Sequence, residues 1–274
     1  GPHGVAYGHM LADVANVVHG EDPGARVMIG GIAYDSFLPP HGTRGFIKEF
    51  LPTVLATLNA KPGGARAYLD AIAVHYYSLQ FPSIINKITE IRAIMQNHGV
   101  AALPIVVPET GYWSADSAGS NEARQAQRLT QIFVEGLAAG VRELSYFSVF
   151  DSGGGMETSG LFHGQDLSRP KLAYSAYRVL TAELTGAKYS RLLGQPGVTG
   201  YVFRMPQGSE KTVFWGANAA GSAVFGGSCL RRVDELGVAN TINDGGPGDG
   251  DGQVNGQIRI AAAANDPAYV AACR

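Results

Sequence analysis

The stretch Pro104-Ile105-Val106-Val107-Pro108-Glu109-Thr110-Gly111-Tyr112-Trp113 decides the fold class of this 274-residue chain. Its β-branched run, residues 105–107, is typical of a parallel strand that is covered on both faces. Glu109 ends this run and opens an aromatic loop, the position where catalytic groups lie in α/β barrels. Glu109 is therefore the candidate nucleophile. The alternative is a loop glutamate that happens to follow a strand.

Strand-like and helix-like segments alternate outward from Glu109. Residues 26–31, 71–77 and 143–151 have the pattern of further strands, and residues 84–95 and 121–137 carry apolar side chains at helical spacing. Ser120 is the expected N-cap of the second helix, and a last helix is expected from about residue 167 to 185. Each unit is long enough for a right-handed parallel crossover, so the chain belongs to the α/β class.

Four motifs in order carry a resemblance to a known group of enzymes. They are Gly30-Gly31, residues 70–77 (DAIAVHYY), residues 107–112 (VPETGY) and Gly160-Leu161-Phe162 ahead of residues 169–174 (RPKLAY). Over roughly residues 5 to 186 the chain resembles clan A retaining glycoside hydrolases, with family-39-like and family-5-like members as the nearest. The resemblance implies the C-terminal half of a (β/α)8 barrel, hence a partial TIM-type barrel of about four parallel strands.

The resemblance also implies roles for individual residues. Glu109 matches the nucleophile that ends the seventh strand in this clan. His75 and Tyr77 match the histidine and tyrosine that end the sixth strand, where they would hold the sugar or the nucleophile. Trp113 and Asp151 are further candidate sugar-binding residues, which rest on their positions in the sequence and not on the resemblance. Trp113 would stack on a sugar ring or pack in a lid, and Asp151 would bind a sugar hydroxyl or cap the glycine turn that follows it.

The matching segment begins in the helix after the fourth strand of the clan's barrel. The acid/base Glu, which follows an Asn at the end of that strand, has no counterpart here. Retaining hydrolysis needs two carboxyl groups about 5 to 5.5 Å apart. Asn121-Glu122 opens a helix, so Glu122 is expected to be a first-turn acid favoured by the helix dipole. Beyond a partner chain, the carboxylates to consider as the acid are Asp35, Asp151 and Glu157.

After Gly186 the sequence changes to short β-rich segments separated by Gly and Asn. We expect a catalytic-type domain over residues 1–186 and a small antiparallel β-sandwich domain over residues 187–274. Tyr201 and Trp215 would be core residues there, with a sugar platform as the alternative. Cys229 and Cys273 suit a disulfide in an oxidising compartment, which slightly favours a secreted protein, and two free thiols remain open.

The acidic loop 244–252 contains enough carboxylates to raise the question of calcium. Its spacing is not that of an EF-hand. Gly and Asp also serve tight turns, so a solvated hairpin loop is the expected structure.

Composition narrows the possible partners and cofactors. The chain is 45% hydrophobic and 16% charged with a formal net charge of −2, and its seven His residues are dispersed. This charge balance lacks the positive charge that is typical of nucleic-acid-binding proteins, and no metal or other cofactor is expected. No apolar run reaches the roughly 18 residues of a membrane span, and residues 1–4 have no signal-peptide pattern.

Four parallel strands cannot close a barrel, since closure takes about eight. Two sheet edges should stay open, and inward-facing Ile29, Val74 and Val106 should lack partners. We therefore expect a homo-oligomer, most simply a two-fold dimer, that covers the open sheet.

The predicted function is hydrolysis of β-glycosides by a retaining glycosidase. Activity would be best on substrates with good leaving groups, because the usual acid is absent. The alternative is a carbohydrate-binding or scaffold protein derived from a glycosidase that lost its general acid.

Overall fold

The computed structural model describes residues 2–34, 46–77, 81–115, 121–152, 158–217 and 219–273. Ser120, Asp35 and Glu157 lie outside these ranges. The chain divides into two compact units, one formed by residues 1–111 with 139–147 and the other by residues 112–138 with 148–274.

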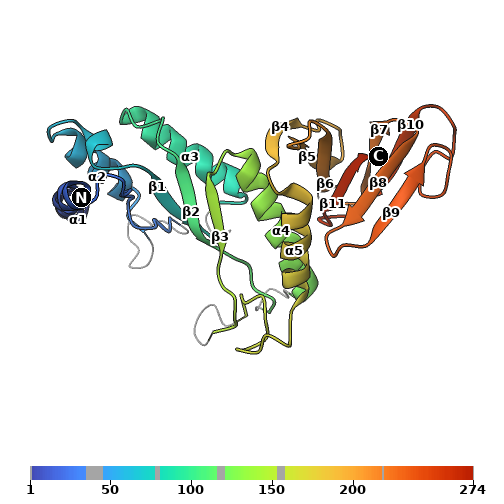
Figure 1. The fold of residues 1–274 in the computed structure, drawn as a ribbon, viewed down its shortest axis with the longest axis horizontal. Coiled ribbons are helices and arrows are strands. Elements are labelled where there is room, and N and C mark those ends of the chain that lie inside the picture. Colours follow the sequence, from blue (N-terminus) through green and yellow to red (C-terminus); the bar gives the residue numbers. More distant parts are fainter. Residues whose placement is uncertain are drawn as a thin grey trace. The chain divides into compact units, whose positions relative to one another are not determined.

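The first unit is built on a parallel three-stranded sheet in the order β1-β2-β3 (Figure 1). Its strands are β1 (Ile72–Tyr76), β2 (Ile105–Thr110) and β3 (Glu143–Tyr146). Its helices are α1 (Pro2–Glu21), α2 (Phe50–Asn59), the short 3₁₀ helix η1 (Ala65–Ala67) and α3 (Ile84–Asn97). The parallel strands and the crossover helix α3 agree with the α/β class expected from the sequence.

The first expected strand, residues 26–31, is reduced to two isolated parallel bridges, Met28 with Ala71 and Ile32 with Val74. Its amides are used elsewhere, which explains why no continuous ladder forms. The Val27 amide donates to the Asp70 carboxylate at 2.7 Å, and the Gly30 amide donates to the Tyr7 hydroxyl at 2.9 Å. The sheet therefore has three regular strands where about four were expected.

Helix α3 has the buried face that the sequence predicts. Its fully buried apolar side chains are Ile84, Ile88, Ile91 and Met95. Ser83 caps the helix, because its side chain accepts a hydrogen bond from the Asn86 amide at 3.3 Å.

Two glycines allow α1 to approach α2 closely. A Cβ added to Gly4 would lie 2.9 Å from Thr53 Cβ, and one added to Gly8 would lie 2.9 Å from Thr57 Cβ. The i, i+4 spacing of these glycines places them on one face of α1, so the pair acts as a contact strip for α2.

The side chains expected to lack partners are in fact buried within this chain. Ile29 and Val74 are 0% exposed and Val106 is 8% exposed. Their exposure therefore gives no support to a covering partner, and the homo-oligomer stays a prediction.

In its described residues the second unit contains two helices, α4 (Glu122–Ala138) and α5 (Leu172–Leu184), and eight strands. The strands are β4 (Lys188–Leu192), β5 (Val198–Arg204), β6 (Glu210–Gly216), β7 (Gly221–Gly226), β8 (Cys229–Asp234), β9 (Ala239–Asn243), β10 (Gln257–Ala262) and β11 (Ala268–Ala272). They form an antiparallel six-stranded sheet, β4-β5-β6-β11-β8-β9, and a two-stranded sheet, β10-β7. The expected domain boundary near residue 187 falls between α5 and β4, and as a boundary it stays a prediction.

The two antiparallel sheets share an apolar core. Phe214, Leu230 and Val270 come from the larger sheet, while Ala223 and Ile258 come from the smaller one. Alternation of buried and exposed residues along β10 gives this core its inward face.

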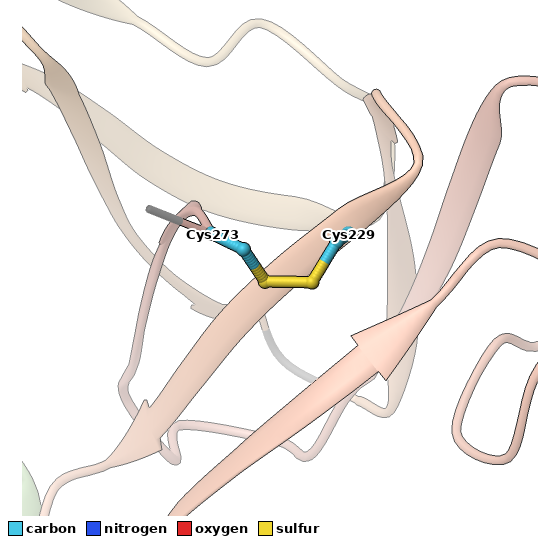
Figure 2. Close-up of a disulfide and its surroundings, with 2 residues drawn as sticks. All are labelled: Cys229 and Cys273. Atoms are coloured by element: carbon cyan, nitrogen blue, oxygen red, sulfur yellow. A yellow bond between two sulfur atoms is a disulfide. The ribbon is translucent and has the colours of Figure 1, made fainter.

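A disulfide fastens the last strand of this core. Cys229 opens β8 and Cys273 follows β11, and the two are bonded with a Cα–Cα distance of 5.5 Å (Figure 2). The Cys273 amide also donates to the Cys229 carbonyl at 3.1 Å. The structure thus favours the disulfide over the two free thiols that the sequence left open.

Tyr201 and Trp215 are each 4% exposed, with ring centroids 5.7 Å apart. They pack in the core and do not form an open platform for sugar.

Among the described residues, no helix has the length and apolarity to span a membrane.

Candidate active site

Strand β2 carries a bulge immediately before Glu109. Ala73 pairs with Val106, but His75 pairs with Glu109, so β2 has one residue more than β1 over this interval. The pairing of β2 with β3 shifts in the same place. Pro108 has no N–H to donate to a ladder, and proline within a sheet is confined to edges and bulges. The bulge brings Glu109 opposite His75, which an unbroken register would not do.

The Glu109 carboxylate is held through one of its oxygens. The Tyr77 hydroxyl donates to Oε1 at 2.5 Å, and His75 Nδ1 lies 3.7 Å from the same oxygen. Within the described part of the chain, Oε2 accepts no hydrogen bond. The Glu109 side chain is 32% exposed, so a ligand can reach it. The structure thus brings together three of the residues that the sequence singled out.

Two contacts with backbone carbonyl groups position the ends of these strands. Thr110, fully buried on β2, donates its hydroxyl to the Tyr76 carbonyl at 2.7 Å, which fixes the peptide that leads into Tyr77. Gly111 lies against the Phe147 carbonyl, where a Cβ would overlap the oxygen. Sequence reasoning missed the role of Thr110, because a threonine in a strand is ordinarily explained by β propensity alone.

Gly31 sets the position of His75. A Cβ added to Gly31 would overlap His75 Nε2 and Cδ2, so the imidazole lies directly on the glycine backbone. The Gly30-Gly31 pair in the sequence was a signal for close backbone approach, although the residue it approaches could not be read from the pattern.

Trp113 and Asp151 belong to the second unit. The Trp113 ring lies 5.8 Å from the Tyr112 ring, measured between centroids. Asp151 accepts a hydrogen bond from the Gly160 amide at 3.0 Å, and its Oδ1 lies 2.5 Å from Lys171 Nζ. The glycines of the turn that follows Asp151, residues 153–155, lie outside the described residues, so both roles considered for Asp151 stay predictions.

Lys171 is the functional-looking residue that the sequence did not point out. Its side chain is 1% exposed, and Nζ also donates to the Ser114 hydroxyl at 3.0 Å and to the Thr158 carbonyl at 3.2 Å. A buried ammonium with these partners is a structural ion pair that ties three segments together. A lysine just before a helix gives no sequence signal for burial.

Glu122 is the first residue of α4, as expected of a first-turn acid. Its Oε2 accepts a hydrogen bond from the Leu172 amide, the first of α5, at 3.0 Å, and its Oε1 lies 2.9 Å from His163 Nε2. Glu122 therefore caps a neighbouring helix. The N-cap of α4 itself is Asn121, whose side chain accepts from the Arg124 amide at 2.9 Å.

The carboxylates of the acidic loop are occupied by backbone amides. Asp249 accepts from the Gly245 and Arg259 amides at 2.9 Å each, and Asp244 accepts from the Gly256 amide at 2.7 Å. These hydrogen bonds from backbone amides hold the pKa of Asp249 below its usual value. Among the described residues no cluster of His, Cys, Asp and Glu is arranged to hold a metal ion. The loop joins β9 to β10, which lie in different sheets and do not pair with each other, so the expected hairpin is wrong.

No protein-family model matches this sequence, and no curated protein matches it. Solved structures do. A family 39 glycoside hydrolase from the gut symbiont Bacteroides cellulosilyticus WH2 aligns with a TM-score of 0.69 and 15% identity over 97% of this chain and 55% of that chain. A glucosidase from Croceicoccus marinus aligns with a TM-score of 0.61 and 12% identity over 97% of this chain and 64% of that chain.

A family 39 β-xylosidase from Caulobacter crescentus aligns with a TM-score of 0.57 and 17% identity over 98% of this chain and 62% of that chain. The chain has a glycoside hydrolase fold. Glycoside hydrolases of families 39, 51 and 30 are all among the structures that share it. At these identities the glycoside hydrolase fold is what the likeness establishes. The chain spans about 55 to 64% of the length of the three proteins named here.

Proposed function

We propose that this chain carries the nucleophile of a retaining glycoside hydrolase acting on β-glycosides, and that the nucleophile is Glu109. The observation that carries the proposal is the way the carboxylate is held. Tyr77 binds Oε1 at 2.5 Å while Oε2 accepts no hydrogen bond from the described residues. One oxygen is thus oriented by the protein, and the other is left for attack.

Each residue then has a defined role. Oε2 of Glu109 forms a bond to the anomeric carbon as the bond from that carbon to the leaving oxygen breaks, and water later hydrolyses the glycosyl-enzyme intermediate. Tyr77 keeps the carboxylate in one rotamer. His75, 3.7 Å from Oε1, lies close enough to hold a sugar hydroxyl beside the nucleophile.

The preference for leaving groups depends on the general acid, a role that this proposal gives to no residue of the sequence. General acid catalysis contributes about 10² to 10⁴-fold, so alkoxide-like leaving groups should depart slowly without it. Activated aryl glycosides need no proton at the leaving oxygen. They should therefore be the best substrates of this chain.

The architecture belongs to the same proposal. Strands β1 to β3, with the bridged segment before β1, form part of a (β/α) barrel, and the β-rich region from residue 187 forms an accessory sandwich. Trp113 and Asp151 stay candidate sugar contacts within this proposal. A homo-oligomer would cover the open sheet edges.

The names of the structural neighbours suggest where to begin. One is a β-xylosidase and another is a glucosidase, so nitrophenyl β-xyloside and β-glucoside are the first substrates to test. A carbohydrate is the partner this function requires.

A mechanism-based fluorosugar with a good leaving group tests the assignment. Incubation should add one fluoroglycosyl group to the intact protein, and peptide mass spectrometry should place it on Glu109. The Glu109→Ala variant should stay unlabelled. The control variant Glu143→Gln, which changes a glutamate with a 74% exposed side chain, should be labelled like the natural protein. A label on another carboxylate, with an active preparation, would remove Glu109 from the role.

The second candidate function is carbohydrate binding without turnover. It is favoured by one observation: among the described residues, the contacts of Glu109 include no second carboxylate. A binder would keep its affinity for sugar when Glu109 is changed to Ala. A catalyst would lose turnover of the aryl glycoside.

A further inference from the structure

A polar pocket lies wholly within the second unit. It has a volume of about 490 Å³ and lies between the first turns of α4 and the loop that joins β10 to β11. Small-molecule sites in proteins have volumes of about 300 to 1,000 Å³, so this pocket is large enough for a sugar and roomy for an inorganic ion.

Two arginines give the pocket its charge. Arg124 and Arg128 are one turn apart on α4, and both guanidinium groups lie over the Tyr112 ring, 6.0 and 5.6 Å from its centroid. In the described residues neither forms an ion pair with a carboxylate, and the Arg124 guanidinium has no hydrogen bond. Both positive charges are thus without an ion-pair partner among the described residues, in a chain whose formal net charge is −2.

One of the arginines is held in place before any ligand arrives. Arg128 Nη1 donates to Gln131 Oε1 at 3.0 Å, and Gln131 Nε2 donates to the Asn265 carbonyl at 2.8 Å. Arg128 Nε is buried and has no partner. Glu135 acts on Arg128 electrostatically without pairing with it. A guanidinium fixed in this way loses little conformational entropy when it binds a carboxylate or sulfate.

The remaining polar groups suit hydroxyls. Asn121, Gln127 and Asn265, three residues with side-chain amides, line the pocket. Asn121 uses its oxygen to cap α4, and its NH₂ group has no partner within the described residues. Amides can both donate to and accept from a hydroxyl, whereas a bare oxyanion only accepts. Guanidinium and amide groups together match a ligand that combines one anion with several hydroxyls.

We propose that this pocket binds an acidic saccharide, one that carries a carboxylate or a sulfate. The anion lies between Arg124 and Arg128, and the sugar hydroxyls meet the three amides. This inference does not depend on the role of Glu109. The site would give the protein an affinity for charged glycans whether or not it hydrolyses them.

Titration calorimetry of the full chain at pH 7 tests the proposal. The probes are digalacturonate, galactose 6-sulfate, the neutral methyl ester of digalacturonate, and inorganic sulfate. At least one of the two acidic sugars should bind, and it should bind at least about tenfold more tightly than the methyl ester and inorganic sulfate, because hydrogen bonds to charged groups contribute about 1.5 to 3 kcal/mol. Which of the two binds distinguishes a carboxylate ligand from a sulfate ligand.

Matched variants locate the binding. Arg124→Ala should weaken binding of the acidic sugar by about 10- to 100-fold. Gln127→Glu, which places a carboxylate in the same wall of the pocket, should weaken binding at least as much. Arg178→Ala removes an exposed arginine from α5 in the same unit and should leave affinity unchanged. Glu109→Ala should also leave it unchanged, which separates this proposal from the proposed activity.

Four results would overturn the proposal. The first is that neither acidic sugar binds. The second and third are that the neutral ester, or inorganic sulfate, binds as tightly as the acidic sugar. The fourth is that Arg178→Ala and Arg124→Ala lower the affinity equally. Circular dichroism checks that each variant is folded. If Arg124→Ala is not folded, the Gln127→Glu variant decides, and unchanged affinity in that variant rejects the site.

Discussion

The Tyr77 hydroxyl and Glu109 Oε1 are 2.5 Å apart, although 32 positions separate the two residues in the chain. Tyr77 follows β1 and Glu109 lies near the end of β2, so the contact joins neighbouring parallel strands at their carboxyl ends. The bulge at Pro108 shapes this contact, because it sets Glu109 opposite His75, whereas an unbroken register would set Glu109 opposite Tyr76.

Tyr77→Phe should lower the turnover of an activated aryl glycoside by about 10-fold or more, since the carboxylate loses the donor that orients it. The Michaelis constant should change much less, because the ring and its packing remain. Steady-state kinetics on the nitrophenyl substrate that proves active measures both. An unchanged kcat would mean that the hydrogen bond has no part in catalysis.

Gly31→Ala should displace His75 and destabilise the first unit, because the new methyl group would overlap the imidazole. Overpacking of this kind costs about 1 to 3 kcal/mol. Chemical denaturation measures the free energy of unfolding. Gly20→Ala is the matched control: it lies in α1 with nothing within 4 Å of the added Cβ, so it should be neutral or stabilising by up to about 1 kcal/mol. Equal behaviour of the two variants would contradict the predicted contact.

Lys171→Met should destabilise the protein by about 3 to 5 kcal/mol, because it leaves Asp151 without its cation partner. The double variant Lys171→Met/Asp151→Asn should recover much of this loss. A double-mutant cycle in urea gives the coupling between the two residues. A coupling near zero would show that Asp151 does not depend on Lys171 and would leave Asp151 open for a sugar.

Burial raises the pKa of Glu135 to about 7, and the nearby Arg128 opposes the shift only in part. Between the unfolded value of about 4.5 and this folded value, the folded protein binds more protons than the unfolded chain. The contribution of Glu135 to stability is therefore complete below about pH 4.5 and is lost as the pH rises to about 7, with a slope of at most about 1.4 kcal/mol per pH unit.

The variant Glu135→Gln keeps a neutral side chain at every pH, so its stability relative to the natural protein should rise between pH 5 and pH 8. Urea denaturation at the two pH values measures this difference. Glu143→Gln changes a glutamate whose side chain is 74% exposed and should show no comparable rise. A constant difference for Glu135→Gln would mean that this carboxyl group titrates as it does in water.

The sequence predicted the elements because local patterns determine them. The apolar spacing of residues 84–95 placed α3, and the β-branched run before Glu109 placed β2. It was less successful for residues 26–31, where amides donate to Tyr7 and Asp70 and only two bridges remain. Those partners lie at distant positions in the chain, and no local sequence pattern predicts them.

By itself, the sequence determined the α/β class, the carboxylate that ends a buried strand, and the pair of cysteines in a β-rich region, because periodicity and residue type are enough for each. Only the tertiary structure decided that Pro108 produces a bulge, that Tyr77 holds one oxygen of Glu109, and that Lys171 is buried against Asp151. The reason is physical: register, rotamer and burial depend on contacts between residues that are far apart in the chain, and these contacts exist only once the strands are paired.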